Sequence, residues 1–429
     1  MQNYNQLINQ FNIFNLFVIL LFSLLPISIL IGNAGINLNI LFIDLTFLIY
    51  CIKHKYWSWL KNKFFILLSI LYLFLILNSI FSYFYIVENE ITGLKRSILF
   101  IKFIILIFAF STLLKDKESF ELINKIWLII SLIVIIDIIY EKYFGYNILG
   151  FKSPSTSRVV SFFKDELVVG GYIMCFGFTS VSYFLKKYIN QKTALYFLII
   201  LLILLISIFL TGERSNFIKS FLLFSVVIYF FSKQNFVLNT KILIPIFIIF
   251  ISCVIYSADS VKDRYSDFIK RIYLETQNNN IIHVISNNRY GAHFDAAIKI
   301  FESYPLTGVG NKNFRSECLK DKYYDKNIKF SKLRCSTHPH QIHFEILSEQ
   351  GLLGYLFIIY IFGFFIIKNI KIFLKEKNIN HLNNIAYLTL FFIPLLPGAS
   401  IFGTFNGSLF WIIFSLTYLN YKKSLLIKM

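Results

Sequence analysis

The sequence has little charge for its length. Only 15% of its 429 residues are Asp, Glu, Lys or Arg, whereas 57% are hydrophobic and 19% are aromatic. Soluble domains usually contain about 25% charged residues. Long apolar runs recur through nearly the whole chain, so the composition excludes an ordinary soluble domain and predicts an all-α polytopic membrane protein.

Cysteine is also scarce. The chain has five cysteines, and no CxxC pair or mixed Cys/His spacing typical of a structural metal site is present. Two of them, Cys318 and Cys335, fall in the same long hydrophilic segment. An oxidising compartment would permit a disulfide between them, so we treat Cys318 and Cys335 as a possible disulfide.

Acidic residues are few relative to basic ones. The 23 Asp and Glu residues stand against 42 Lys and Arg residues, for a formal net charge of +19. The distribution of this charge argues against nucleic-acid binding, because many lysines lie in short segments between apolar runs and no nucleic-acid-binding motif appears. Lysines in such positions orient helices and contact anionic lipid, so we expect membrane lipid as a partner and no nucleic acid.

Apolar runs of about 17–25 residues predict twelve transmembrane helices. Lysine-rich loops alternate with lysine-poor ones, which predicts that the lysine-rich loops and both termini are cytoplasmic. The first run has no cleavage site, so we expect a retained helix and no signal peptide. The prediction divides the chain into helices 1–9 (1–257), a large, partly helical outer loop (258–342) and helices 10–12 (343–429). The helices are predicted to begin near Phe11, Ile36, Phe64, Ser97, Ile123, Leu167, Ala194, Phe217, Ile242, Phe344, Asn384 and Gly407.

Arginine is distributed differently from lysine. All eight arginines fall on the predicted outer side, and none lies in a cytoplasmic loop. Arginine is a planar, permanently charged donor suited to phosphate or diphosphate, although chance or surface ion pairing is the alternative explanation. Arg158, Arg214 and Lys219 lie at the outer ends of helices, where ionisable groups are costly unless they are paired or face water. We therefore treat them as binding candidates, with snorkelling interface anchors as the alternative.

Three histidines precede an apolar helix in "CSTHPHQIHFEILSEQGLLG", which runs from Cys335 to Gly354. A metal site, a pH sensor, a proton-transfer centre and simple packing are the possible interpretations of His338, His340 and His343. Their spacing fits a metal site poorly. A neutral imidazole that acts as general base, or that orients a nucleophilic hydroxyl, is favoured. The helix is expected to start near His340, which would then share a face with Gly351 and Gly354.

The large loop contains a further helical pattern. In "NNRYGAHFDAAIKIFESYPLTGVGNKNFR" the apolar residues repeat at helical spacing over 292–301. Pro305, Gly308 and Gly310 are expected to end this helix in a turn.

Several of these stretches together resemble the O-antigen ligase/polymerase superfamily of bacterial envelope glycosyltransferases. The ligase motif is His, then Asn, Ser or Gln, nine residues, Gly, two residues and Gly. His340, Gln341, Gly351 and Gly354 match every fixed position. "PLTGVGNKNF", "LTGERSNF" and "SRVVSFFKDELVVGGYI" resemble other family segments, although Ser161 replaces a usual glycine. The resemblance extends over roughly residues 150–420.

The resemblance implies a C-type membrane glycosyltransferase fold and a metal-independent, inverting reaction that needs no cofactor. A glycan would pass from undecaprenyl diphosphate to a sugar hydroxyl of the lipid A–core of lipopolysaccharide, or to another glycan acceptor. The active site would face the periplasm at the bacterial inner membrane. Arg214 and Arg289 would hold the diphosphate, and His340 would assist the acceptor hydroxyl. The substrate-binding candidates are Arg158, His338, Gln341, Lys219 and Glu349.

Three other functions remain open. An O-antigen polymerase would use the same donor with a second lipid-linked repeat as acceptor, and a protein O-oligosaccharyltransferase would use a protein. A transporter of the lipid-linked glycan is less favoured, because the chain has no repeated half and a transporter needs no large outer loop.

Overall fold

The computed structural model describes residues 13–86, 91–155, 157–164, 166, 168–234, 248, 252, 259–278, 288–328, 330–394 and 396–426. Every regular element in these ranges is helical, which confirms the predicted all-α class. Short 3-10 turns and one π-helical segment, η3 (Met174–Phe178), join the α-helices. The α-helices are α2 (Ile13–Ser23), α3 (Leu25–Ile31), α4 (Asn33–Lys53), α5 (Lys63–Tyr85), α6 (Ile91–Ile98), α7 (Ile101–Leu113), α8 (Lys117–Phe144), α9 (Val169–Ile173), α10 (Thr179–Lys187), α11 (Thr193–Leu210), α12 (Arg214–Gln234), α14 (Asp259–Asn278), α16 (Arg289–Ser303), α17 (Phe314–Glu317), α18 (Ile342–Glu376), α19 (Ile379–Phe391) and α20 (Phe405–Leu426).

Seven helical segments in the described part of the chain are long and apolar enough to cross a membrane. They are α4, α5, α6 with α7, α8, α11, α12 and α18. α2 and α3 pass the same test together, with a bend of 43° between them, and would make an eighth. The chain is therefore a multi-pass membrane protein. The count of twelve stays a prediction, and the predicted ninth helix lies almost entirely outside the described residues.

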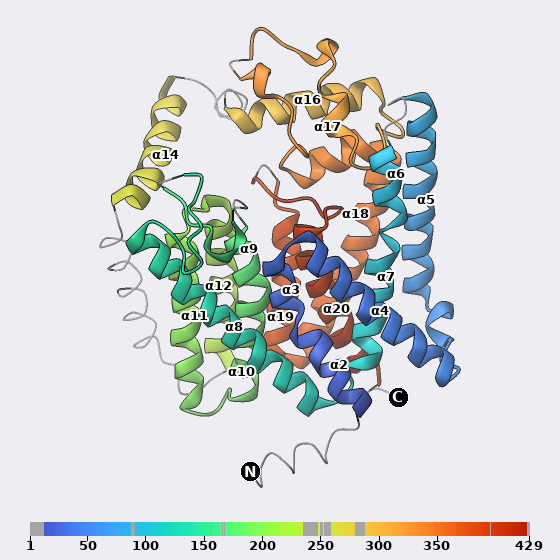
Figure 1. The fold of residues 1–429 in the computed structure, drawn as a ribbon, viewed down its shortest axis with the longest axis vertical. Helices are drawn as coiled ribbons and strands as arrows, with labels where there is room; N and C mark the ends of the chain where they lie inside the picture. The colour runs from blue at the N-terminus through green and yellow to red at the C-terminus, as the bar shows by residue number, and fades with distance from the viewer. Residues whose placement is uncertain are drawn as a thin grey trace.

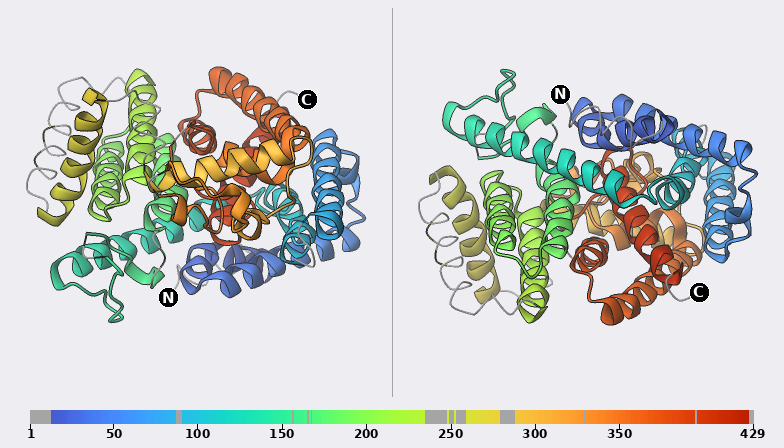
Figure 2. Two further views of the ribbon diagram at one scale, coloured as in Figure 1. Left: turned by 90° about the horizontal axis from the view of Figure 1, so that it is seen from above. Right: turned by 90° about the horizontal axis from the view of Figure 1, so that it is seen from below.

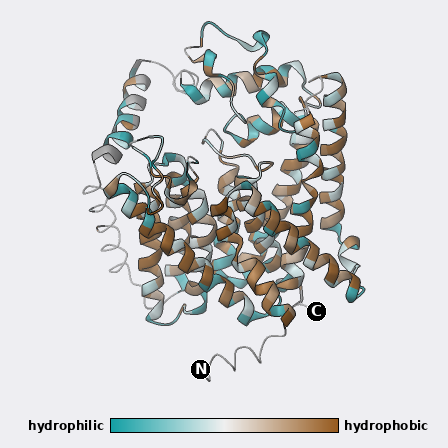
Figure 3. Cartoon of the chain, in the orientation of Figure 1, coloured by the Kyte–Doolittle hydropathy of each residue, from teal (hydrophilic) through white to brown (hydrophobic). Residues whose placement is uncertain are grey.

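The helices form a bundle with a cap at one end (Figure 1). The cap contains α16 and α17 from the predicted large loop, and Figure 2 shows α16 lying across the centre of the bundle when it is seen from above. α14, from the same loop, lies at the edge of the bundle, where Tyr265 packs on Phe209 and Phe217. Figure 3 shows that the bundle is mostly hydrophobic whereas the cap is largely hydrophilic. α2 begins and α20 ends at the end of the bundle opposite the cap. This arrangement agrees with a large loop and two termini on opposite sides of a membrane.

Aromatic contacts between helices hold the bundle interior together. α20 packs against both α7 and α19. The ring centroids of Phe365 on α18 and Phe414 on α20 are 4.2 Å apart, and Phe64 on α5 stacks on both rings. Within lipid, apolar burial alone does not bring helices together, so close packing of this kind stabilises their association.

The cap has its own small core, formed around α16. The side chain of Asn288 caps the helix by accepting the Gly291 N–H at 3.0 Å, and the helix ends before Pro305, as the sequence predicts. Cys318 and Cys335 form a disulfide with a Cα–Cα distance of 5.5 Å, which confirms the possible pairing. The disulfide connects the two ends of the segment that packs over α16.

α18 begins near His340, as expected, but does not include it. Gln341 is its N-cap and Ile342 its first residue, so the expectation that His340 shares a helical face with Gly351 and Gly354 is wrong. The physical reason is local, because Pro339 restricts the residue before it and His340 has a positive φ of 59°. The backbone at His338 and His340 is therefore not helical, and α18 cannot extend toward the N-terminus through these residues.

Glycines allow α18 to approach its neighbours closely. Gly351 has φ 64° and ψ −170°, and it kinks the helix. The N–H of Val309 donates to Ser348 O at 2.9 Å, and a Cβ on Gly351 would lie only 2.3 Å from Leu306 O. A Cβ on Gly354 would lie 2.8 Å from the Phe74 ring of α5. The turn after α16 thus rests directly on the kink.

Candidate active site

His340 lies where the cap meets the bundle. Its ring centroid is 4.4 Å from that of His338, 5.3 Å from that of His293 and 5.6 Å from that of Tyr290. The Nε2 atom is 2.9 Å from the hydroxyl oxygen of Ser336. Three aromatic or imidazole rings from two separate segments therefore lie around the imidazole of His340.

The loop between α19 and α20 holds this histidine cluster from the bundle side. The N–H of Gly398 donates to His340 O at 2.6 Å, and Nε2–H of His338 donates to Gly398 O at 3.2 Å. The hydroxyl of Ser215, on the first turn of α12, donates to the carbonyl of Pro397. These bonds fix the left-handed backbone of His340, a conformation that non-glycine residues keep only when their surroundings enforce it.

Burial keeps the three clustered histidines neutral. Loss of hydration, the largest cause, together with repulsion from His338, His293, Lys312 and Arg289, lowers the pKa of His340 to about 3. Burial also lowers the pKa of His338 to about 4 and reduces the pKa of His293. At neutral pH each ring has one nitrogen that carries a proton and one that can accept one.

Three arginines gather beside the start of α12. The guanidinium of Arg264 on α14 donates to Gly212 O at 2.8 Å and to the Ser157 hydroxyl at 3.3 Å. Burial lowers the pKa of Arg264 to about 10, and the positive charges of Arg158 and Arg214 add to the effect. Like charges this close create a strongly positive region that favours an anion.

Tyr290 connects these arginines to the histidine cluster. Its hydroxyl is close enough to Arg264 for their charges to interact, and its ring contacts His340. Arg289, the first residue of α16, is exposed at the rim of the cluster. His293 follows one turn later on the same helix, and its Nδ1–H donates to Arg334 O at 2.9 Å. α16 therefore presents one cation and two rings to the same region.

A buried ion pair between Lys312 and Glu345 lies next to the histidine cluster. Nζ of Lys312 is 2.9 Å from Glu345 Oε1 and donates to the Ser400 hydroxyl at 2.9 Å. The Lys312 N–H donates to Glu349 Oε2 at 2.7 Å. Both glutamates are fully buried. These contacts tie the glycine turn of the cap, α18 and the α19–α20 loop into one unit.

Gln341 and Glu349, both predicted to bind substrate, are engaged by the protein itself. Oε1 of Gln341 accepts the N–H groups of His343 and Phe344 at 2.7 and 3.1 Å, and Gln341 is buried. Glu349 accepts backbone N–H groups of the cap turn. We therefore interpret both as residues that position the histidine cluster.

The other predicted site residues lie together or on adjoining segments. His338, His340 and Arg289 belong to the cluster, and Arg158 and Arg214 form the arginine group with Arg264. Lys219 is buried and follows Ser215 by one turn of α12. Its Nζ lies against the α19–α20 loop, since a Cβ added to Gly398 would be 3.3 Å from it. In the part of the chain that the structure describes, no three His, Cys, Asp or Glu side chains are arranged to hold a metal ion.

Sequence reasoning missed four members of the site. They are His293, Tyr290, Arg264 and Lys312. A signal existed for His293, because it follows Arg289 by four residues in a predicted helix and so shares its face. Lys312 carried no such signal, since a single lysine in a hydrophilic loop is usually exposed.

The segment that contains most of this site matches a known protein family. Residues 199–359 match the family described as O-antigen ligase. The matched segment runs from α11 into α18 and includes Arg214, Arg264, Arg289 and His340. No curated protein matches the chain. Over residues 199–359 the chain is similar to the O-antigen ligase family, which supports the resemblance to the O-antigen ligase/polymerase superfamily seen in the sequence.

Proposed function

We propose that the chain is an O-antigen ligase that transfers a glycan from undecaprenyl diphosphate to a sugar hydroxyl of the lipid A–core of lipopolysaccharide. The reaction would take place at the periplasmic face of the bacterial inner membrane. The observation that supports this most is the placement of a neutral, half-buried His340 near a group of arginines at the capped end of an apolar helical bundle. A base and an anion-binding group are the two parts that such a transfer needs.

The arginines suit the donor. When the bond between the anomeric carbon and the diphosphate oxygen breaks, the oxygen keeps the electron pair and the leaving group gains negative charge. Arg214 and Arg289 are proposed to hold this diphosphate, with Arg158 and Arg264 adding positive charge beside Arg214. Guanidinium groups fixed in advance stabilise developing charge most strongly where water is scarce.

His340 suits the acceptor. Its neutral ring would take the proton of the sugar hydroxyl while the hydroxyl oxygen attacks the anomeric carbon from the side opposite the diphosphate, which inverts the configuration. With a pKa of about 3 the empty site makes His340 a weak base. A bound diphosphate would offset the nearby cations and raise that pKa, because an opposite charge favours the protonated imidazole. Donor binding would thus activate the base.

The test is a deletion of the gene followed by gel analysis of lipopolysaccharide. Loss of a ligase removes all O-chain from lipid A, loss of a polymerase leaves a single repeat, and loss of a protein transferase leaves both patterns intact but removes glycan from a glycoprotein. Purified chain that joins glycan to acceptor without energy input would exclude a transporter.

Complementation of the deletion tests His340 directly. His340→Ala should restore at most about 1% of wild-type transfer, since loss of a general base usually costs ~10²–10⁴-fold. His343→Ala is the matched control, because His343 belongs to the same motif but bonds Tyr355 and Phe392 O away from the cluster. Wild-type transfer by folded His340→Ala would contradict the assignment.

A further inference from the structure

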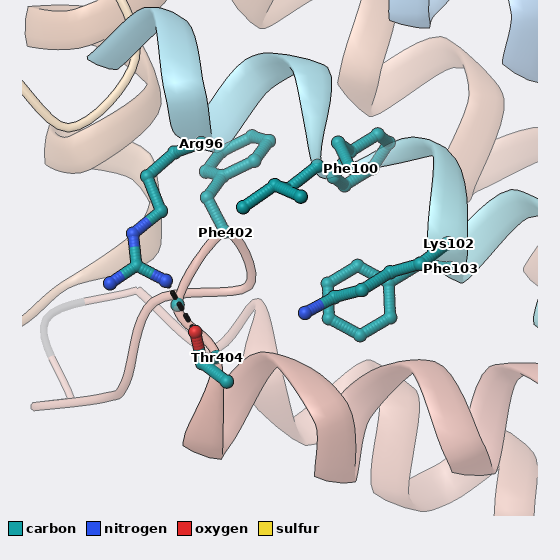
Figure 4. Close-up of a pocket in the computed structure, with 8 residues that line it drawn as sticks. Arg96, Phe100, Lys102, Phe103, Phe402 and Thr404 are labelled. Carbon is teal, nitrogen blue, oxygen red and sulfur yellow. Dashed lines mark hydrogen bonds between the residues drawn. The ribbon is translucent and has the colours of Figure 1, made fainter. Parts of the chain in front are cut away.

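A second pair of cations lies outside the site described above. Arg96 at the end of α6 and Lys102 at the start of α7 line a small pocket next to Thr404, and Figure 4 shows both charged groups directed toward the same opening. The side chain of Leu99 also lines it. The remaining large side chains of the wall are Phe100, Phe103 and Phe402.

Among the residues that the structure describes, neither cation is bonded to an acid there. Arg96 donates to the hydroxyl of Thr404, and Lys102 donates to the amide oxygen of Asn37 at 2.5 Å. Arg96 and Lys102 are close enough to repel each other, and the carboxylate of Asp44 on α4 interacts only with Lys102. In the described part of the chain, two cations and one acid leave the pocket positive, within the apolar segment Ile91–Leu113 where unpaired charge is costly.

The pocket is joined to the histidine cluster by one short loop. In the loop between α19 and α20, Gly398 bonds His340, Ser400 bonds Lys312, and Thr404 bonds Arg96. α12, with the arginine group, and α6 lie on opposite sides of this loop (Figure 1). A group bound at Arg96 would therefore approach His340 from the side opposite the proposed donor. Arg96 and Lys102 also lie outside the segment that matches the family.

We propose that Arg96 and Lys102 bind a phosphate group on the headgroup of the acceptor lipid. An oxyanion between them would remove their mutual repulsion and accept charge-assisted hydrogen bonds from both. The occupant is a lipid because the adjoining surface is apolar, with Ile98 and Leu99 exposed to 46% and 55%. This inference rests on the proposed function, which supplies an acceptor lipid, but binding can be measured without glycan transfer.

The experiment is a titration of the purified full chain in detergent by native mass spectrometry. The probes are lipid A with its phosphates, the same lipid A with the phosphates removed, undecaprenyl diphosphate and inorganic phosphate. Wild-type chain should bind phosphorylated lipid A at least tenfold more tightly than the phosphate-free form. Arg96→Gln and Lys102→Gln should each weaken binding of the phosphorylated form by about tenfold, the effect of losing one charge-assisted bond.

The matched control is Lys95→Gln. Lys95 is an exposed cation next to Arg96 on α6 but does not line the pocket, so its loss should change binding less than twofold. Lys102→Arg should keep the phosphate preference. Undecaprenyl diphosphate should bind Arg96→Gln as it binds wild type, and should bind Arg214→Gln more weakly.

Several results would overturn the proposal. Equal wild-type affinity for the two forms of lipid A would do so, and this comparison needs no variant to fold. An equal loss in Lys95→Gln would indicate general surface charge, displacement by millimolar inorganic phosphate would indicate a free-anion site, and loss of undecaprenyl diphosphate binding in Arg96→Gln would indicate a donor site. Failed glycan transfer with an intact preference for phosphorylated lipid A would refute the proposed function, but the assignment of Arg96 and Lys102 as a phosphate-binding pair would remain.

Discussion

Gln341 stands next to His340 and supports it through the backbone. Its side chain accepts two N–H groups at the start of α18 and donates to Ile393 O at 3.3 Å. Gln341→Ala should lower the free energy of unfolding by about 1 kcal/mol, the usual cost of a lost N-cap, and should also reduce transfer because His340 loses its anchored neighbour. Gln341→Asn keeps a capping amide and should retain most activity. Thermal unfolding and the transfer assay measure the two effects.

The control for Gln341 is another cap, far from the histidine cluster. Asn378 caps α19 by accepting the N–H groups of Asn380 and His381. Asn378→Ala should lower stability by a similar amount and leave the transfer rate of the folded protein near wild type. Equal losses of transfer in both variants would mean that stability alone, and not the position of His340, explains the effect of Gln341.

Residue chemistry made part of the site predictable. Arg158, Arg214 and Lys219 were predicted because ionisable groups at the ends of apolar runs are costly and so suggest function. His340 was predicted from its motif and its proton-transfer chemistry, and Arg289 from the family resemblance. Lys312 and Glu345 were not found, because their pairing depends on the cap turn folding back onto α18, a contact between residues 33 positions apart. Gln341 and Glu349 were found as polar residues near the motif, but only the fold shows that backbone groups already occupy them.

At the scale of the helix, the kink in α18 is the place where the turn after α16 packs against the bundle. Gly351→Ala should be severely destabilising, because its positive φ is unfavourable for alanine and the new Cβ would lie 2.3 Å from Leu306 O. Gly363→Ala in the same helix is the matched control, since a Cβ there meets nothing within 4 Å, and alanine favours helix. Thermal midpoints should separate the two variants by well over 5 °C. Similar midpoints would mean that the kink is not required.

Helix identity was easier to predict than helix boundaries or membrane crossing. Apolar runs marked nearly every helix in the bundle, yet α19 and the elements α9, η3 and α10 are each too short to count as an apolar span. α19 carries Asn380, His381, Asn383 and Asn384 in its first turns, all buried. Packed inside a bundle, a helix needs no fully apolar surface, because neighbouring helices shield its polar groups from lipid. Composition alone cannot reveal that shielding.

At the scale of the whole molecule, the cap and the two ends of the described chain lie at opposite ends of the bundle. The lysine-rich loops predict that the ends face the cytoplasm and the cap the periplasm. The disulfide in the cap agrees with this orientation, because disulfides persist in an oxidising compartment such as the periplasm. A lipid-linked donor and a lipopolysaccharide acceptor would then meet beneath the cap.

Single cysteines can test this orientation. Lys326 is exposed in the cap and Lys375 is exposed at the far end of α18. In a chain with Cys51, Cys175 and Cys253 replaced by Ala, a membrane-impermeant maleimide applied to cells with an opened outer membrane should label Lys326→Cys. Lys375→Cys should be labelled only after the inner membrane is opened. The reverse pattern would contradict the orientation that the positive-inside rule predicts from the lysine-rich loops. It would also put His340 on the cytoplasmic side and so contradict the proposed acceptor.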